Sequence, residues 1–209
     1  MGQYISSPST PAPTAEDLRA QAIAAGDLRR RYSEQSQAAY RAGRGQEAKR
    51  LSELAKAQWA EAERLNSLAA DLAFGNYNPS YPSTLTSTRH GGGWALLSWL
   101  GWGKVEGQKT KGLERLDLHG LYVAEAITRV EAHMRACKEY GVERTMLITG
   151  RGNRSVDGVA KIKPSVEKWL QERQAGFRVV KGSNDGAVTV ELVQETTGLL
   201  SGVMKIFGW

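Results

Sequence analysis

Residues 113–120 (LERLDLHG) and 144–153 (RTMLITGRGN), with a helix-patterned run between them, decide the fold of this chain. The first stretch alternates apolar and polar side chains, as a β-strand does, and the second begins with the apolar run of another strand. In a strand–helix–strand unit the two strands are parallel, so both stretches end at the same edge of one sheet. Ligands of open α/β sheets bind at that edge. The sequence therefore predicts that Asp117, His119 and a basic, glycine-containing loop share one small surface.

Further periodic segments follow the second stretch. Residues 162–174 have the pattern of a helix, and residues 177–181 and 187–193 have the pattern of strands. The last two are separated by residues 183–186 (SNDG), whose Asp-Gly pair suits a tight hairpin. The order β-α-β-α-β-β predicts an α/β fold, a two-layer sandwich with a mixed four-stranded sheet.

Residues 15–75 are predicted to form an α-helical hairpin domain that precedes the sheet. They are rich in good helix formers, and Thr14 with Asp17 three residues later is typical of an N-cap. Residues 42–45 (AGRG) break the run, which gives two antiparallel helices with small residues between them. Acids on the same helices match the basic residues 29–31 (RRR), so a solvated, salt-bridged face is favoured over a nucleic-acid-binding stripe.

The remaining segments have the composition of tails and linkers. Residues 1–14, rich in Ser, Pro and Thr, are expected to be a disordered tail. Residues 76–112 have linker chemistry and contain residues 94–102 (WALLSWLGW), a tryptophan-rich segment. We expect this segment to dock on a folded domain, with a partner-binding segment or an interfacial membrane anchor as alternatives. Residues 196–209 form an apolar C-terminal tail of the same character.

Cysteine content and the N-terminal residues bear on the compartment. Cys137 is the only cysteine, so no disulfide framework exists and a reducing compartment is expected, cytoplasmic with the nucleus also compatible. The longest apolar run is too short to span a bilayer. Residues 1–6 (MGQYIS) fit the N-myristoylation pattern, which makes Gly2 a candidate lipidation site. One acyl chain would hold the protein to membranes weakly and reversibly, and an unmodified flexible start is the alternative.

Positive charge is concentrated around the second motif. The net charge of +6 favours a polyanionic partner, and residues 144–163 contain five basic residues against one acid, Asp157. Glycines let the backbone approach a phosphate closely, arginines clamp it, and a helix N-terminus favours an anion. The predicted nucleic-acid-binding residues are Gly150, Arg151, Gly152, Asn153, Arg154, Ser155, Lys161 and Lys163.

Asp117 and His119 are the predicted catalytic residues. A carboxylate beside an imidazole fixes its tautomer and raises its basicity. Taken singly, a histidine at a strand end is more often structural, and a Gly-x-Gly loop is more often a turn; their joint occurrence at matching positions favours a site. No cofactor is expected, although the same two side chains leave a divalent metal such as Mg²⁺ open.

These motifs closely resemble the two signature motifs of the Smr (small MutS-related) domain. The resemblance covers residues 113–195 and is carried by 116–121 (LDLHGL), Glu125-Ala126, 149–152 (TGRG), Ser155, Gly158, 161–164 (KIKP), Trp169-Leu170 and Asn184-x-Gly186. The helical segment 15–74 resembles the small domain of unknown function placed upstream of Smr domains, notably in fungal proteins. The resemblance implies nucleic-acid binding and, in some members, DNA nicking or RNA cleavage that involves the Asp-x-His motif. Other members have His-Gly-Lys-Gly or similar at the second motif, so a second histidine is missing here.

Residues and resemblance together predict a nucleic-acid-binding protein that acts as an endonuclease or nickase, with RNA favoured over DNA. His119 would act as general base on a ribose 2′-hydroxyl or on water, held by Asp117. Arg151, Arg154 and Lys161 would stabilise the pentacovalent phosphorane. Two alternatives stay open: a non-catalytic nucleic-acid-binding module, and a protein-interaction adaptor that uses residues 94–102 or the helical hairpin.

Overall fold

The computed structural model of the chain describes residues 12–82, 112–153, 158–173, 176–180 and 185–193. They divide into two compact units, Met1–Asn76 and Tyr77–Trp209. Several expected features lie outside the described residues: Gly2 and the N-terminal tail up to residue 11, the tryptophan-rich segment 94–102, Arg154, Ser155, and the C-terminal tail 196–209.

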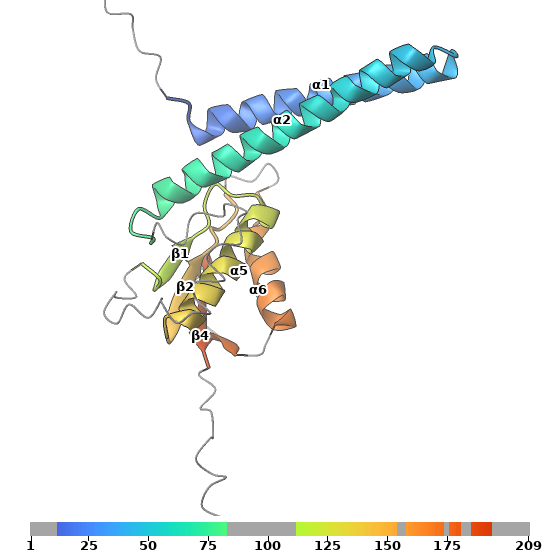
Figure 1. Ribbon diagram of the computed structural model, residues 1–209. Helices are drawn as coiled ribbons and strands as arrows, with labels where there is room; N and C mark the ends of the chain where they lie inside the picture. The colour runs from blue at the N-terminus through green and yellow to red at the C-terminus, as the bar shows by residue number, and fades with distance from the viewer. Residues whose placement is uncertain (1–11, 83–111, 154–157, 174–175, 181–184, 194–209) are drawn as a thin grey trace, which may run out of the picture. The chain divides into compact units, whose positions relative to one another are not determined.

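The first unit is an antiparallel pair of long helices, α1 (Ala15–Arg41) and α2 (Gly45–Tyr77), as Figure 1 shows. The predicted N-cap is present. The Asp17 N–H donates to Thr14 Oγ1 at 3.1 Å and the Thr14 N–H donates to the Asp17 carboxylate at 2.9 Å, which closes a capping box. Between the helices, Leu18, Ala22, Leu65 and Ala69 form a buried cluster. Small side chains at this seam let the two helices approach closely.

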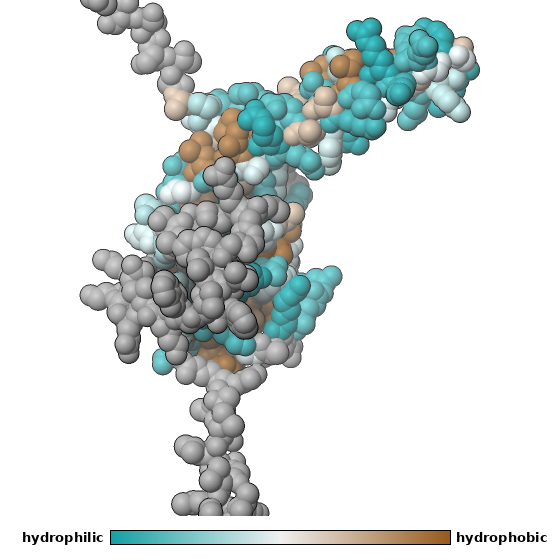
Figure 2. Space-filling model, viewed as in Figure 1, coloured by the Kyte–Doolittle hydropathy of each residue, from teal (hydrophilic) through white to brown (hydrophobic). Residues whose placement is uncertain are grey.

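The face of the hairpin seen in Figure 2 is mostly hydrophilic, with some hydrophobic residues exposed on it. Within the expected salt-bridged face, Arg30 pairs with Asp27 at 3.2 Å, whereas the Arg29 guanidinium lies 4.5 Å from the centre of the Trp59 ring. Among the described helices, none combines the length and the apolar composition needed to cross a membrane.

The second unit has the predicted order of strands and helices. Within its described residues, the elements are β1 (Arg115–Asp117), α5 (Val123–Glu139), β2 (Arg144–Ile148), α6 (Ile162–Glu172), β3 (Phe177–Val180) and β4 (Ala187–Leu192). The sheet order is β1-β2-β4-β3, with β1 parallel to β2 and the other neighbours antiparallel. Helices α5 and α6 pack side by side against one face of the sheet (Figure 1). The predicted two-layer sandwich with a mixed four-stranded sheet, preceded by a helical hairpin, is therefore confirmed.

The register of the sheet positions the ends of β1 and β2. Leu116 pairs with Leu147, which pairs with Val188, and all three side chains are fully buried. A shift of one residue in the pairing of the strands would turn these apolar side chains to the opposite face of the sheet, where Asp117 and Met146 lie. The apolar row therefore fixes Asp117 opposite Ile148, where the two parallel strands end.

A buried polar cluster ties residues before the sheet to its core. His133 on α5 is fully buried, with its Nδ1 3.2 Å from the Tyr81 hydroxyl oxygen and its Nε2 2.8 Å from Thr145 Oγ1. Burial lowers the pKa of His133 to about 4 and raises the pKa of the neighbouring Cys137 thiol to about 12. Both groups are therefore neutral at pH 7, and Cys137 is a buried structural residue.

The lowered pKa of His133 predicts loss of stability in acid. Between pH 6.5 and about 4 the unfolded chain binds a proton at this histidine that the folded unit excludes, so the unfolding free energy falls as pH falls. This histidine should contribute a loss of about 3 kcal/mol between pH 7 and pH 4. Urea unfolding followed by the NMR signals of β2 and β4 amides would measure it. His133→Gln should show a flatter pH dependence, and an identical dependence in both proteins would contradict this assignment.

Candidate active site

Asp117 and His119 form a close pair where β1 ends. The chain turns at Gly120, whose φ of 74° suits glycine, and His119 folds back toward the end of the strand. Asp117 Oδ1 accepts hydrogen bonds from His119 Nδ1 at 2.6 Å and from the His119 backbone N–H at 3.0 Å. The Asp117 side chain is only 10% exposed, while that of His119 is 44% exposed. In the neutral imidazole this carboxylate holds the proton on Nδ1 and leaves Nε2 as the basic nitrogen.

Asn78 holds the backbone of Asp117 from the open side of the sheet. Its Nδ2 donates to the Asp117 carbonyl at 2.8 Å, and its Oδ1 accepts from the Asp117 N–H at 2.8 Å. Because β1 is an edge strand, this amide takes the place that a neighbouring strand would occupy. The Tyr77 ring lies 5.5 Å from the imidazole, centroid to centroid, with the two planes tilted by 41°. Residues 77 and 78 thus position both members of the pair.

The sequence does not mark Tyr77 or Asn78 as supporting residues, because the composition of residues 76–112 predicts a linker. In the structure α2 continues to Tyr77, Asn78 hydrogen-bonds to Asp117, and the Tyr81 hydroxyl hydrogen-bonds to His133. A single amide and a single phenol beside prolines have no periodic pattern, and the same composition is typical of linkers. Only the fold shows that Asn78 and Tyr77 reach the site, and that Tyr81 reaches the buried His133.

The support from Asn78 gives a testable prediction. Asn78→Ala removes both hydrogen bonds to the backbone of Asp117, which should lower the unfolding free energy by about 1–2 kcal/mol. If Asp117 and His119 are catalytic, the looser pair should also slow cleavage about tenfold. Thermal unfolding and single-turnover cleavage would measure the two effects. Asn76→Ala, at an exposed position of α2, is the matched control and should change neither. Equal behaviour of the two variants would contradict the proposed support.

The glycine-containing loop after β2 lies against the imidazole. Pairing continues past the end of β1, since the Leu118 N–H donates to the Ile148 carbonyl at 2.9 Å. A Cβ atom placed on Gly150 would lie only 2.9 Å from His119 Nε2, and the φ of Gly150 is +73°. The two motifs therefore meet at one edge of the sheet, as the parallel-strand argument predicts.

Hydrogen bonds to Gly186 hold this loop in place. The N–H groups of Thr149 and Gly150 both donate to the Gly186 carbonyl, at 2.9 and 3.0 Å. The amide of Gly150 is therefore already used within the protein, and an anion would meet the loop from Arg151 onward. The Arg151 side chain passes close to Gly186, where a Cβ atom would lie 3.3 Å from Arg151 Cγ. Arg151 is exposed.

Gly152 connects the loop to the start of α6. Its φ is +81°, and a Cβ atom there would lie 2.4 Å from the Ala160 nitrogen and 2.6 Å from the Val159 carbonyl carbon. Only glycine permits this approach of two backbone segments. Asn153, the next residue, is exposed.

The two predicted lysines lie at the start of α6. Lys161 is the exposed residue that precedes the helix, and Lys163 Nζ donates to the Asp185 carbonyl at 3.3 Å. Lys163 is thus tied to the residue next to Gly186, which holds the loop at Gly150.

Few of the described side chains at this site could bind a metal ion. Within the described ranges, no group of three or more His, Cys, Asp or Glu side chains could hold one. The Mg²⁺ alternative would rest on Asp117 and His119 alone, and the Nδ1 of that histidine already donates to the carboxylate.

Comparison with known families finds two matching family models. Residues 116–193 match the Smr domain, and residues 16–78 match DUF1771, a domain of unknown function. Both matches agree with the resemblance seen in the motifs.

Curated relatives differ in how much of this chain they match. "Endonuclease NBR9" of Saccharomyces cerevisiae is 30% identical over 175 residues, which are 84% of this chain and 60% of that protein. An Smr domain-containing protein of Schizosaccharomyces pombe is 31% identical over 84 residues, 40% of each chain. NEDD4-binding protein 2 of Homo sapiens is 42% identical over 71 residues, 32% of this chain and 4% of that protein. The chain thus spans less than two thirds of the length of each.

Solved structures of Smr domains are also similar. The solution structure of the B3BP Smr domain is 38% identical and covers 38% of this chain and 78% of its own, with a TM-score of 0.33. The crystal structure of the human small-MutS related domain is 38% identical and covers 37% of this chain and 99% of its own, with a TM-score of 0.31.

Proposed function

Since this chain carries an Smr domain preceded by a DUF1771 region, we propose that it is a nucleic-acid-binding endonuclease that cleaves RNA phosphodiesters. One observation carries the proposal. Asp117 orients the imidazole of His119 through a 2.6 Å hydrogen bond, and the glycine loop that precedes Arg151 lies against Nε2 of the same ring. This arrangement supports the proposal, because phosphodiester cleavage by a general base requires the base to lie beside the bound phosphate.

In the proposed reaction His119 Nε2 removes the proton from the ribose 2′-hydroxyl next to the scissile phosphate. The 2′-oxygen attacks phosphorus, the bond from phosphorus to the 5′-oxygen breaks, and that oxygen leaves and takes up a proton from water, while His119 later returns its proton to solvent. The products are a 2′,3′-cyclic phosphate and a 5′-hydroxyl end. Asp117 keeps the proton on Nδ1 and stabilises the imidazolium that forms.

The basic loop would stabilise charge on the phosphorane. Arg151 is the exposed cation closest in sequence to the loop glycine that faces Nε2. Arg151, together with Arg154 and Lys161, would neutralise the charge that develops on the non-bridging oxygens. Since the Gly150 N–H is bonded to Gly186, this role falls to side chains and to amides from residue 151 onward.

The single histidine favours RNA over DNA as substrate. RNA carries its own nucleophile next to the phosphate, so one well-placed base gains the advantage of an intramolecular reaction. DNA lacks this hydroxyl, and its cleavage would require the site to bind and activate a water molecule. Asp117 and His119 are suited to removing the proton from the ribose 2′-hydroxyl.

The test is incubation of the pure protein with labelled RNA and DNA, single- and double-stranded, with and without EDTA. We expect RNA to be cut in EDTA, to leave a 2′,3′-cyclic phosphate, and to resist cutting when the scissile nucleotide is 2′-deoxy. Cutting of DNA or of the deoxy-substituted RNA would instead indicate that water is the nucleophile. Binding with no product on a gel would contradict the endonuclease proposal and favour a non-catalytic module.

A further inference from the structure

The turn of the helical hairpin is its most basic region. Residues 36–52, which we call the hairpin tip, contain four basic residues and one acid, whereas residues 15–35 and 53–76 together contain six basic residues and eight acids. The basic residues of the tip are Arg41, Arg44, Lys49 and Arg50. Positive charge is therefore localised at one end of the hairpin, which contrasts with the balanced charge along the helices.

Most of this charge is not neutralised within the helical unit. The only acid of the tip, Glu47, pairs with Arg44 at 3.0 Å. Across residues 12–82, no ion pair involves Arg41, Lys49 or Arg50, and all three are exposed. Among residues 12–82, the tip therefore presents to solvent three cations that form no ion pair.

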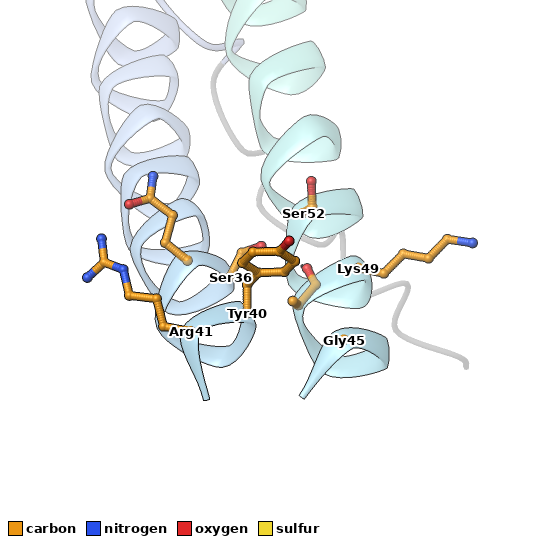
Figure 3. A pocket seen from close by; sticks show the side chains of 8 residues that line it. Ser36, Tyr40, Arg41, Gly45, Lys49 and Ser52 are labelled. Carbon is orange, nitrogen blue, oxygen red and sulfur yellow. The ribbon is translucent and has the colours of Figure 1, made fainter. Parts of the chain in front are cut away.

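Tyr40 lies among these cations. It is 76% exposed, the highest value for a large hydrophobic residue in the described part of the chain. Its ring borders an open hollow of about 570 Å³ that Arg41 and Lys49 also line. Figure 3 shows the ring between the ends of α1 and α2, with these two side chains extending away from it on opposite sides. A hydrogen bond of 2.8 Å from Ser36 Oγ to the Ala48 carbonyl joins the two helices at this position.

An exposed ring flanked by cations suits single-stranded nucleic acid. Phosphates would meet the cations, and an unpaired base would stack on Tyr40. An acidic peptide could pair with the cations, but its residues do not each carry a flat ring that could stack on Tyr40. A duplex keeps the faces of its bases stacked inside the helix, where Tyr40 cannot reach them. We propose that the hairpin tip is a second binding surface for single-stranded RNA. The identity of the ligand as RNA rests on the function proposed for the Smr domain.

The test uses the full chain and two single-stranded RNAs, of about 8 and about 40 nucleotides, with affinity measured by fluorescence anisotropy. For the long RNA, Tyr40→Ala should weaken binding about tenfold, because stacking is lost. The triple variant Arg41→Gln, Lys49→Gln, Arg50→Gln should reduce the slope of log affinity against log salt by about 2, at about 0.7 for each phosphate contact. Cleavage of the short RNA should stay at the wild-type rate in both variants.

Matched variants separate this proposal from general effects. Tyr40→Phe keeps the ring and should bind as the wild type does. Lys56→Gln with Arg64→Gln removes two cations that are already paired with Glu53 and Glu61, and should barely change the slope. Circular dichroism would show that every variant keeps its helices.

Three results would overturn the hairpin-tip proposal. Wild-type affinity of both tip variants for the long RNA would do so while leaving the endonuclease proposal intact. If Tyr40→Ala lost as much affinity for duplex RNA as for the long single strand, the tip would recognise a different ligand. The same would follow if the triple variant lost as much affinity for an acidic peptide. Failure of the wild-type protein to bind either RNA would remove both proposals.

Discussion

His119→Ala is expected to slow RNA cleavage by about a hundred- to ten-thousand-fold while leaving RNA affinity nearly unchanged. The imidazole is the only described base whose tautomer is held by a buried carboxylate at the edge of the sheet where the loop lies. Removing it deletes the proton acceptor, but the basic loop that would bind the phosphate remains. Single-turnover cleavage and anisotropy on the same RNA would measure the two quantities separately.

Asp117→Asn is the companion variant for this prediction. An amide can still accept the hydrogen bond from the His119 backbone, but it carries no charge to stabilise an imidazolium. Its cleavage rate should therefore fall between that of the wild type and that of His119→Ala. A His119→Ala protein that cuts as fast as the wild type would show that this histidine is not the base.

Gly150→Ala is expected to slow cleavage about a hundredfold, because a misplacement of about 1 Å at a reacting group can cost that much. The added Cβ would lie 2.9 Å from His119 Nε2 and 3.3 Å from Cδ2, so the imidazole must move. The left-handed φ of +73° adds backbone strain of about 1–2 kcal/mol. Cleavage and the free energy of unfolding should be measured together.

Gly141→Ala is the control that separates strain from displacement. Gly141 follows α5, and its φ of +68° imposes similar backbone strain, but a Cβ there has no atom within 4 Å. Its stability should fall about as much as that of Gly150→Ala, while its cleavage rate should stay near the wild-type value. If both variants lost activity equally, displacement of the imidazole would not be the cause.

The local sequence pattern was sufficient to predict the secondary structure and the edge of the sheet at which the two motifs meet. The predicted strand 144–148 has the same bounds in the structure, and the Thr14–Asp17 capping box begins α1 at the predicted residue. These features depend on side-chain period and on contacts between near neighbours, which the amino-acid order encodes directly. Because the two strands of a strand–helix–strand unit are parallel, Asp117, His119 and Gly150 could also be predicted to lie at the same edge of the sheet.

Local pattern could not supply the contacts that support the site. Asn78 lies 39 residues before Asp117, and Tyr81 lies 52 residues before its partner His133. The helical pattern of residues 123–139 likewise gave no reason to expect a fully buried histidine in place of an apolar side chain. These contacts depend on residues that the fold brings together from distant parts of the chain, and no periodicity in the sequence marks them.

The sequence by itself determined the order of elements, the apolar row that sets the register, and therefore which two motifs meet. Only the tertiary structure decided how the pair is held: Asn78 on the open edge of β1, Tyr77 beside the imidazole, and Gly186 bonded to the loop amides. The reason is physical. Hydrophobic periodicity acts along the chain and is repeated many times, whereas a hydrogen bond between distant residues exists only after the fold has brought its two groups together.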